Sequence, residues 1–246
     1  MSKHQFNLQA VHPSWHDCLL SALQAMDPAY LENLQATDHW LPGPDKIFSA
    51  FSLPLSKVNY LLLGESPYPR AASANGYAFW DAAVGELWSP QGMSKKVNRA
   101  TSLRHFIKML FVAEGLLQPQ ACTQPHIAAL DKTHLIQTNN ELFTHLLDHG
   151  FLLLNATLVL HSQSKSSQVR KDALAWQPFL KYVIAFLVER RPEVEFVLFG
   201  KIAQVIEKLL PGAHLKKIFV EHPYNHSFVG NQTVTNFFKP FHLLRV

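Results

Sequence analysis

Residues 59–70, NYLLLGESPYPR, place polar side chains directly after a short apolar run. The run ends at Gly64, and Glu65, Ser66 and Tyr68 follow in a turn braced by two prolines. Glu65 offers a carboxylate and Ser66 a hydroxyl, so the turn could hold a general base, a nucleophile or neither. The types of residue therefore mark this turn as a candidate site.

Ser66 can be interpreted as a serine-hydrolase nucleophile, because Asp172 and His222 follow it in the chain order of an α/β-hydrolase triad. That nucleophile turn requires the pattern G-x-S-x-G, but Tyr68 occupies the fifth position. Pro67 directly after the serine also lacks the backbone N–H that an oxyanion hole needs. A hydrolase is therefore the third and weakest of three interpretations.

Four apolar runs of strand length alternate with segments of helical spacing. The runs cover residues 58–64, 150–160, 194–200 and 216–222. None alternates cleanly with polar residues, which is typical of strands buried on both faces of a parallel sheet. Residues 101–117 are amphipathic, and Thr101 or Ser102 is expected to cap a helix there. The pattern predicts a three-layer α/β/α sandwich around a central, mostly parallel four-stranded sheet.

The length and composition favour one domain. With 246 residues, 48% of them hydrophobic, the chain suits one large domain better than two. We expect residues 1–57 to form a helical lead-in and residues 58–246 to form the α/β core. The formal charge of +4 permits a polyanionic partner without requiring one.

Cofactors and membranes are not indicated. Cys18 and Cys122 form no CxxC pair, which excludes a metal site built from four cysteines. The N-terminus lacks the apolar core of a secretion signal, and no apolar run approaches the ~20 residues that cross a bilayer. We expect a cytoplasmic or nucleoid-associated protein with no metal, no cofactor and no membrane partner.

Ligands of open α/β sheets lie beyond the carboxyl ends of the strands. Three residues are candidates for binding: Asn155 within the second apolar run, His222 at the end of the fourth, and Phe79 in the segment after the first. Asn155 interrupts a hydrophobic run, so its amide either bonds the backbone or reads the edge of a flat heterocycle. His222 is either a turn residue or a donor to a developing anion. Phe79 is either a core residue or a platform on which a base stacks.

Basic residues gather in two places. Lys95, Lys96 and Arg99 surround a predicted helix start, and Lys201 follows Gly200, the last residue of the third apolar run. These residues form either a solvated surface or a set of contacts to phosphate groups.

Seven segments resemble those of uracil-DNA glycosylases in the same order. They are LLLGESPYP, NGYAFW, TSLRHF, FLLLNATLVL, AWQPF, FVLFGKIAQ and EHPYNHSFVG. The resemblance covers roughly residues 14–246 and is closest to the family 1 type. It implies a monomeric, metal-free enzyme of base-excision repair, which flips uracil out of DNA and cuts the bond from base to sugar.

The resemblance also assigns roles to the candidates. Asn155 would form hydrogen bonds with the edge of uracil, and Phe79 would stack on the base. Tyr68 would block the methyl group of thymine, and Gly64 would belong to the same base-binding site. His222 would donate to uracil O2 as negative charge develops. Loops that pinch the DNA backbone would carry Ser102, Gly200, Lys201 and Ser227.

The turn departs from the family pattern Gly-Gln-Asp-Pro-Tyr-His, which reads Gly-Glu-Ser-Pro-Tyr-Pro here. Ser66 stands where the family has an aspartate that orients water, and Glu65 replaces a glutamine. His226 replaces the leucine that wedges into the vacated base stack. On an extended segment Glu65 would point away from the side that Ser66 faces. Asp81 is a second possible replacement for the missing carboxylate.

A positioned base typically contributes ~10²–10⁴-fold to a rate. We therefore expect a glycosylase of reduced activity, with His222, Ser66 and Glu65 as its catalytic group. The alternative is a relative that binds DNA or a flipped base without turnover.

Overall fold

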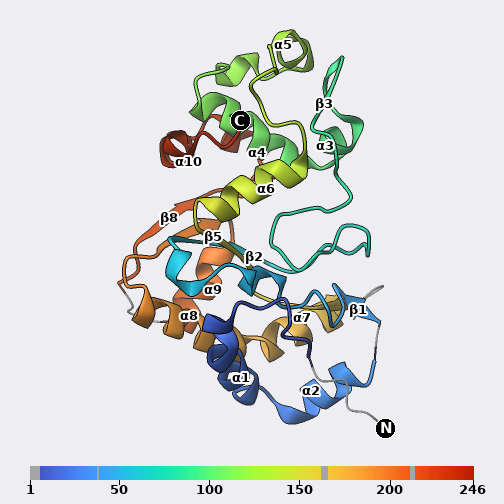
Figure 1. The fold of residues 1–246 in the computed structure, drawn as a ribbon, viewed down its shortest axis with the longest axis vertical. Helices are drawn as coiled ribbons and strands as arrows, with labels where there is room; N and C mark the ends of the chain where they lie inside the picture. Colours follow the sequence, from blue (N-terminus) through green and yellow to red (C-terminus); the bar gives the residue numbers. More distant parts are fainter. Residues whose placement is uncertain (1–5, 38, 162–165, 211–213) are drawn as a thin grey trace.

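The computed structural model describes residues 6–37, 39–161, 166–210 and 214–246. A parallel sheet lies at its centre (Figure 1). The strand order in this sheet is β5-β2-β7-β8. The strands are β2 (Tyr60–Gly64), β5 (Phe151–Asn155), β7 (Glu195–Phe199) and β8 (Lys217–Val220). This arrangement confirms the predicted α/β architecture with a four-stranded parallel sheet.

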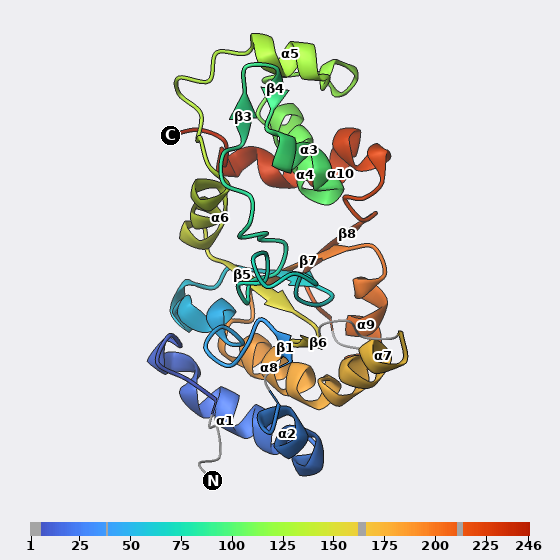
Figure 2. The same ribbon diagram turned by 90° about the vertical axis from the view of Figure 1, so that its right-hand side faces the viewer.

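Helices cover both faces of this sheet, so the molecule has three layers (Figure 2). One side carries α1 (His16–Gln24), α2 (Pro28–Gln35), α7 (Ser166–Ala175), α8 (Gln177–Arg190) and α9 (Ile202–Leu209). The other side carries α3 (Lys95–Arg99), α4 (Thr101–Ala113), α5 (Gln124–Ala129), α6 (Asn139–Asp148) and α10 (Gln232–Phe238).

Side chains of the central strands alternate between two hydrophobic cores, one on each face. Leu61 and Leu63 of β2 belong to the core beneath α1 and α8, whereas Leu62 belongs to the core beneath α4 and α6. All five residues of β5 are buried. Burial on both faces explains why these runs show no alternation of polar and apolar residues.

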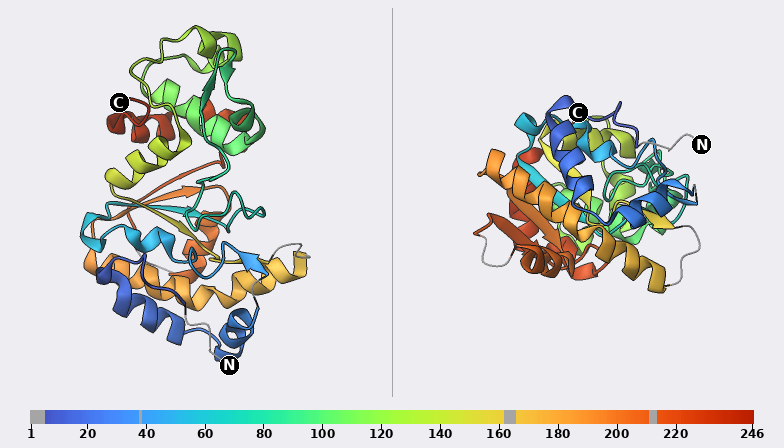
Figure 3. Two further views of the ribbon diagram at one scale, coloured as in Figure 1. Left: turned by 45° about the vertical axis from the view of Figure 1, so that its right-hand side comes forward. Right: turned by 90° about the horizontal axis from the view of Figure 1, so that it is seen from below.

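The N-terminal part packs directly on the α/β layers (Figure 3). Trp15 and Phe51 are fully buried in the same core as Phe179 of α8. A two-residue ladder joins β1 (Trp40–Leu41) to β6 (Leu160–His161), and a second small ladder joins β3 (Trp88–Ser89) to β4 (Gly92–Met93). No helix in the described part of the chain has the length and apolar character to span a membrane.

Two local predictions were wrong. The run 150–160 is not one strand, because β5 ends at Asn155 and the chain bends before it re-pairs in β6. The start of α4 also lacks the expected cap: Ala100 occupies the N-cap position and no side chain bonds there. The nearby capping serine is Ser94, which accepts a hydrogen bond from the N–H of Val97 at the start of α3.

Candidate functional site

A cavity of about 200 Å³ opens at the carboxyl ends of the parallel strands. Strand ends supply Gly64, Asn155 and Phe199, and the loop after β8 supplies His222. The described residues that line it are Leu63, Gly64, Glu65, Ser66, Tyr68, Phe79, Ser102, Asn155, Phe199, Ile202 and His222. The structure thus brings together eight of the residues singled out from the sequence, and it adds Leu63, Phe199 and Ile202.

Asn155 is a buried residue in the lining of this cavity. The residue is only 3% exposed, and its side chain forms no hydrogen bond within the described residues. A Cβ added at Gly64 would lie 2.6 Å from Asn155 Oδ1 and 2.9 Å from Ala78 Cβ. Glycine at this position is therefore required for the amide to sit where it does. A buried amide without a protein partner is poised to bond a ligand, because leaving it unpaired costs roughly 1–3 kcal/mol.

Phe79 is held beside the cavity in an unusual backbone conformation. Its φ of 63° is left-handed, a region that a bulky residue rarely occupies. The Ala78 N–H donates to Leu153 O of β5 at 3.0 Å, and the Tyr68 hydroxyl donates to Phe79 O at 3.0 Å. Burial, the largest cause, raises the pKa of Tyr68 far above neutral, so the phenol remains a donor. The centroids of the Phe79 and His222 rings are 6.3 Å apart.

The His222 imidazole is oriented by its own loop. Its Nδ1 accepts a hydrogen bond from the Tyr224 N–H at 3.1 Å, so the neutral ring carries its proton on Nε2. Burial lowers the pKa of His222, and the charge of Glu65 offsets part of that shift. A Cβ at Gly200, where φ is 67°, would lie 3.0 Å from His222 Cβ. Glycine at position 200 therefore leaves room for this imidazole.

Glu65 and Ser66 both line the cavity. The expectation that Glu65 points away from it was wrong, because the chain bends at both residues instead of continuing extended. Glu65 is exposed and its charge acts on His222. Ser66 is half-buried and makes no side-chain hydrogen bond in the described part of the chain. Glu65 is the one carboxylate among the described lining residues.

Asp81 does not replace the missing carboxylate. It is 2% exposed, pairs with Arg70 Nη2 at 2.9 Å and accepts the Ala83 N–H at 2.9 Å. It lines a different cavity from the one that contains Asn155 and His222.

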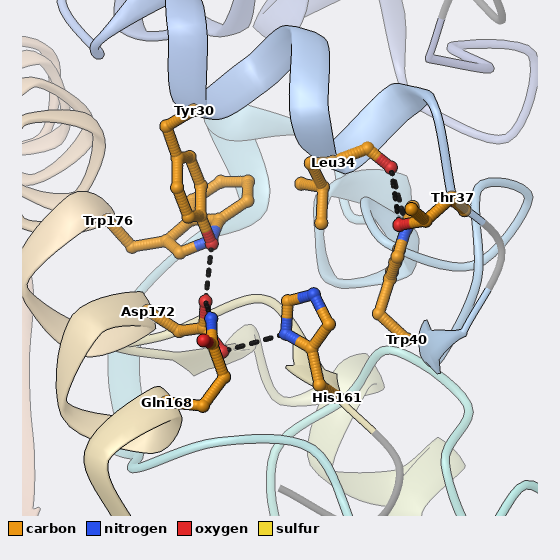
Figure 4. A network of polar contacts seen from close by, with 8 residues as sticks. All are labelled: Tyr30, Leu34, Thr37, Trp40, His161, Gln168, Asp172 and Trp176. Atoms are coloured by element: carbon orange, nitrogen blue, oxygen red, sulfur yellow. Dashed lines mark hydrogen bonds and ion pairs between the residues drawn. The ribbon is translucent and has the colours of Figure 1, made fainter.

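The carboxylate of Asp172 is bonded to residues other than His222, which rules out the hydrolase triad. It accepts hydrogen bonds from the Tyr30 hydroxyl and Gln168 Nε2, each at 3.0 Å, and it pairs with His161 Nδ1 at 2.9 Å (Figure 4). This network ties α2, α7 and β6 together, and Trp176 completes it by donating to Tyr30. The interpretation of Ser66 as a triad nucleophile with Asp172 was therefore wrong.

The predicted basic residues fall into two groups. Lys96 and Arg99 line a second cavity of about 240 Å³ together with Arg70, a cation that sequence reasoning missed. Lys95 is exposed on α3 beside them. Lys201 lines a third cavity of about 220 Å³, which shares its Glu65 and Ser66 wall with the first.

The loop after β8 leads into the short helix η5 (His226–Gly230), whose first two residues, His226 and Ser227, are exposed. The His226 ring meets the ring of His105 edge-on, with the centroids 5.7 Å apart. His105 is a buried histidine of α4 that carried no signal in the sequence beyond its residue type.

No protein-family model matches the chain. A uracil-DNA glycosylase of Azobacteroides pseudotrichonymphae genomovar. CFP2 is 24% identical over 208 residues, which are 82% of this chain and 79% of that protein. A uracil-DNA glycosylase of Pseudomonas syringae pv. syringae (strain B728a) is 26% identical over 90% of this chain and 86% of its own length. Among solved structures, the UNG protein of Nitratifractor salsuginis is 40% identical, with a TM-score of 0.90 over 97% of this chain and 95% of that one.

Proposed function

The chain belongs to the uracil-DNA glycosylase superfamily, and we propose that it hydrolyses the bond between uracil, or a related deaminated base, and deoxyribose in DNA. One observation carries the proposal. The amide of Asn155, which bonds no other described residue, and the neutral imidazole of His222 share one cavity, and the Phe79 ring borders it. An amide, a donor and an aromatic face together are what recognition of a flipped pyrimidine requires.

Each group has a role in bond cleavage. The sugar gains positive character while the base departs with negative charge on its oxygen O2. His222 Nε2–H would donate to that oxygen as the charge grows. This hydrogen bond would stabilise the transition state more than the bound substrate, and it would therefore lower the activation barrier. Asn155 would offer its donor and its acceptor to the other edge of the base, and Phe79 would stack on its face. Water would then attack the sugar.

We infer that activity is lower than is usual in the superfamily, because Ser66 cannot accept a proton from the attacking water at neutral pH. Among the described residues that line the cavity, Glu65 alone carries a carboxylate, and its side chain is exposed. Glu65 is therefore the remaining candidate for the general base. The same observation supports the alternative, a protein that binds the flipped base without turnover.

Uracil release from an oligonucleotide, measured with excess protein and alkaline cleavage of the abasic product, tests the proposal. Product from uracil-containing strands and none from thymine-containing strands is expected. Tight binding of uracil-containing DNA with no product would support the non-catalytic alternative. A protein that neither bound uracil-containing DNA selectively nor released uracil would contradict both the catalytic proposal and the non-catalytic alternative.

Ser66→Asp should accelerate uracil release. The carboxylate would provide the missing base, for which a gain of up to ~10²–10⁴-fold is typical. Glu65→Gln in the wild-type background should slow release, whereas in the Ser66→Asp background it should matter much less. Single-turnover rates of the four proteins form a double-mutant cycle. Equal effects of Glu65→Gln in both backgrounds would show that Glu65 is not the substitute base.

The rate should persist below the ordinary imidazole pKa of about 6.5. Burial lowers the pKa of His222, so the neutral, Nε2-protonated form survives as the pH falls through that value. Protonation of Nδ1 would then break the bond from the Tyr224 N–H and reduce the rate. Glu65→Gln removes the charge that opposes the shift, so it should move the midpoint further down. A midpoint above 6.5 in single-turnover rates at saturating protein would contradict this assignment.

The basic cavity should bind the phosphate backbone. Lys96→Ala and Arg99→Ala should each weaken DNA binding for every sequence and reduce the slope of log K against log salt by about 0.9. Lys181→Ala on α8, on the opposite side of the sheet, is the control and should leave the slope unchanged. Fluorescence anisotropy at several salt concentrations measures the slope, and identical slopes for all four proteins would place the backbone elsewhere.

A further inference from the structure

Two histidines from distant parts of the chain lie on opposite sides of one peptide group. His105 Nδ1 of α4 donates to the Pro223 carbonyl oxygen at 2.8 Å. The N–H of the same peptide unit belongs to Tyr224 and donates to His222 Nδ1 at 3.1 Å. The hydrogen bonds therefore form a continuous chain from His105 through the peptide to His222.

The far end of this chain is rigidly placed. His105 is 6% exposed and lies among buried residues of α4, and Pro223 is also buried. A carbonyl oxygen can only accept, so Nδ1 of His105 must carry a proton. Burial, the largest cause, lowers the pKa of His105, although the Pro223 carbonyl opposes that shift. The bond joins residues 118 positions apart and anchors the loop after β8 to α4.

Resonance couples the two ends of a peptide group. Donation to the carbonyl oxygen increases the double-bond character of the C–N bond and makes the N–H a better donor. A stronger bond from Tyr224 holds His222 Nδ1 without a proton and fixes the ring plane. The proton of His222 then remains on Nε2, the atom required to donate inside the cavity.

We propose that His105 is a positioning residue, which fixes the tautomer and orientation of His222 through the Pro223–Tyr224 peptide. Its effect on catalysis rests on the proposed function, but the state of the His222 ring can be measured without it. His105 touches no substrate atom in this scheme. Its contribution is to keep the donor aligned before the base departs.

Two substitutions separate positioning from packing. His105→Leu removes the donor, whereas in His105→Asn the Nδ2 atom stands where Nδ1 was and can still donate to Pro223. ¹⁵N NMR of the imidazoles, with the His222 signals identified by their loss in His222→Gln, reports the tautomer directly. We expect a single Nε2-protonated signal in the wild type and in His105→Asn, and tautomer averaging in His105→Leu.

The matched control is His145→Leu. His145 of α6 also bonds a backbone carbonyl, that of Leu243 at 3.1 Å, but it is not among the described residues that line the cavity. This variant should lose comparable stability and leave the His222 signals unchanged. In single-turnover release of uracil, His105→Leu should be slowed by up to about 10-fold, the usual effect of losing one hydrogen bond, with unchanged half-saturation, and His105→Asn should recover most of that loss.

The outcomes are distinguishable. Unchanged His222 signals in His105→Leu, or equal changes in the Leu and Asn variants, would overturn the positioning role. A shift of the His222 signals in a protein that releases no uracil would uphold the hydrogen-bond chain and count against the proposed function alone.

Discussion

Replacing His222 with leucine should slow single-turnover release of uracil by ~10²–10³-fold, the usual cost of removing one donor to a developing oxyanion. The bond from Nε2 strengthens only as charge accumulates on the leaving base, so the loss should appear in the rate of the chemical step. Binding of DNA that contains an uncleavable uracil nucleotide should stay within a few-fold of wild type. Alkaline gel assays give the first quantity and fluorescence anisotropy gives the second.

His126→Leu is a suitable control for this experiment. His126 is an exposed histidine of α5 whose ring bonds Thr123, and it lies on an element that contributes nothing to the cavity. It should release uracil at the wild-type rate. If His222→Leu also kept a rate within about five-fold of wild type, the negative charge would have to be stabilised by another group.

Asn155→Leu should combine lost activity with retained or increased stability. Leucine has the same number and branching of side-chain heavy atoms but neither donor nor acceptor, so two hydrogen bonds to the base disappear. Such a bidentate pair is worth about 1–3 kcal/mol, and kcat/KM should therefore fall by up to ~10²-fold. The free energy of unfolding should rise by roughly 1 kcal/mol, because the free protein no longer carries a buried amide without a protein partner.

Denaturant unfolding and kcat/KM of the same preparation test this pair of effects. A loss of activity accompanied by a marked loss of stability would identify Asn155 as a structural asparagine. Thr157→Val is the matched control, since Thr157 is a buried polar residue two positions further on that does not line the cavity with His222.

The sheet could be predicted because burial on both faces leaves a signature in every strand. The apolar residues of β2 and β5 are uninterrupted by polar ones, which is typical of strands in a parallel sheet that is covered on both faces. Polar residues at strand ends could then be placed at one rim. The sequence alone did not settle the role of Asn155, because an amide inside an apolar run can also bond the backbone; its assignment as a base reader came from the resemblance to the family.

Features set by backbone bends were not accessible from the sequence. Glu65 reaches the cavity because the chain bends after β2, and the alternation expected of an extended segment does not apply there. The positive φ of Phe79 had no signal either, since a bulky residue seldom adopts it.

Long-range pairings were equally hidden. The pairing of Arg70 with Asp81 and the bond from His105 to Pro223 depend on where loops meet in space. A buried histidine in an amphipathic helix resembles any other core residue until its partner is seen. Most residues that line the cavity could therefore be predicted from the sequence, whereas the supporting contacts of Arg70 and His105 could not.

A crystal structure of the protein bound to DNA that carries an uncleavable deoxyuridine analogue tests the central claim most directly. The account predicts the uracil ring against Phe79, with the amide of Asn155 at 2.7–3.2 Å from its edge and His222 Nε2 at a similar distance from O2, the usual range of such bonds. A base that remained stacked in the duplex, or that occupied another cavity with Asn155 and His222 unbonded, would contradict it.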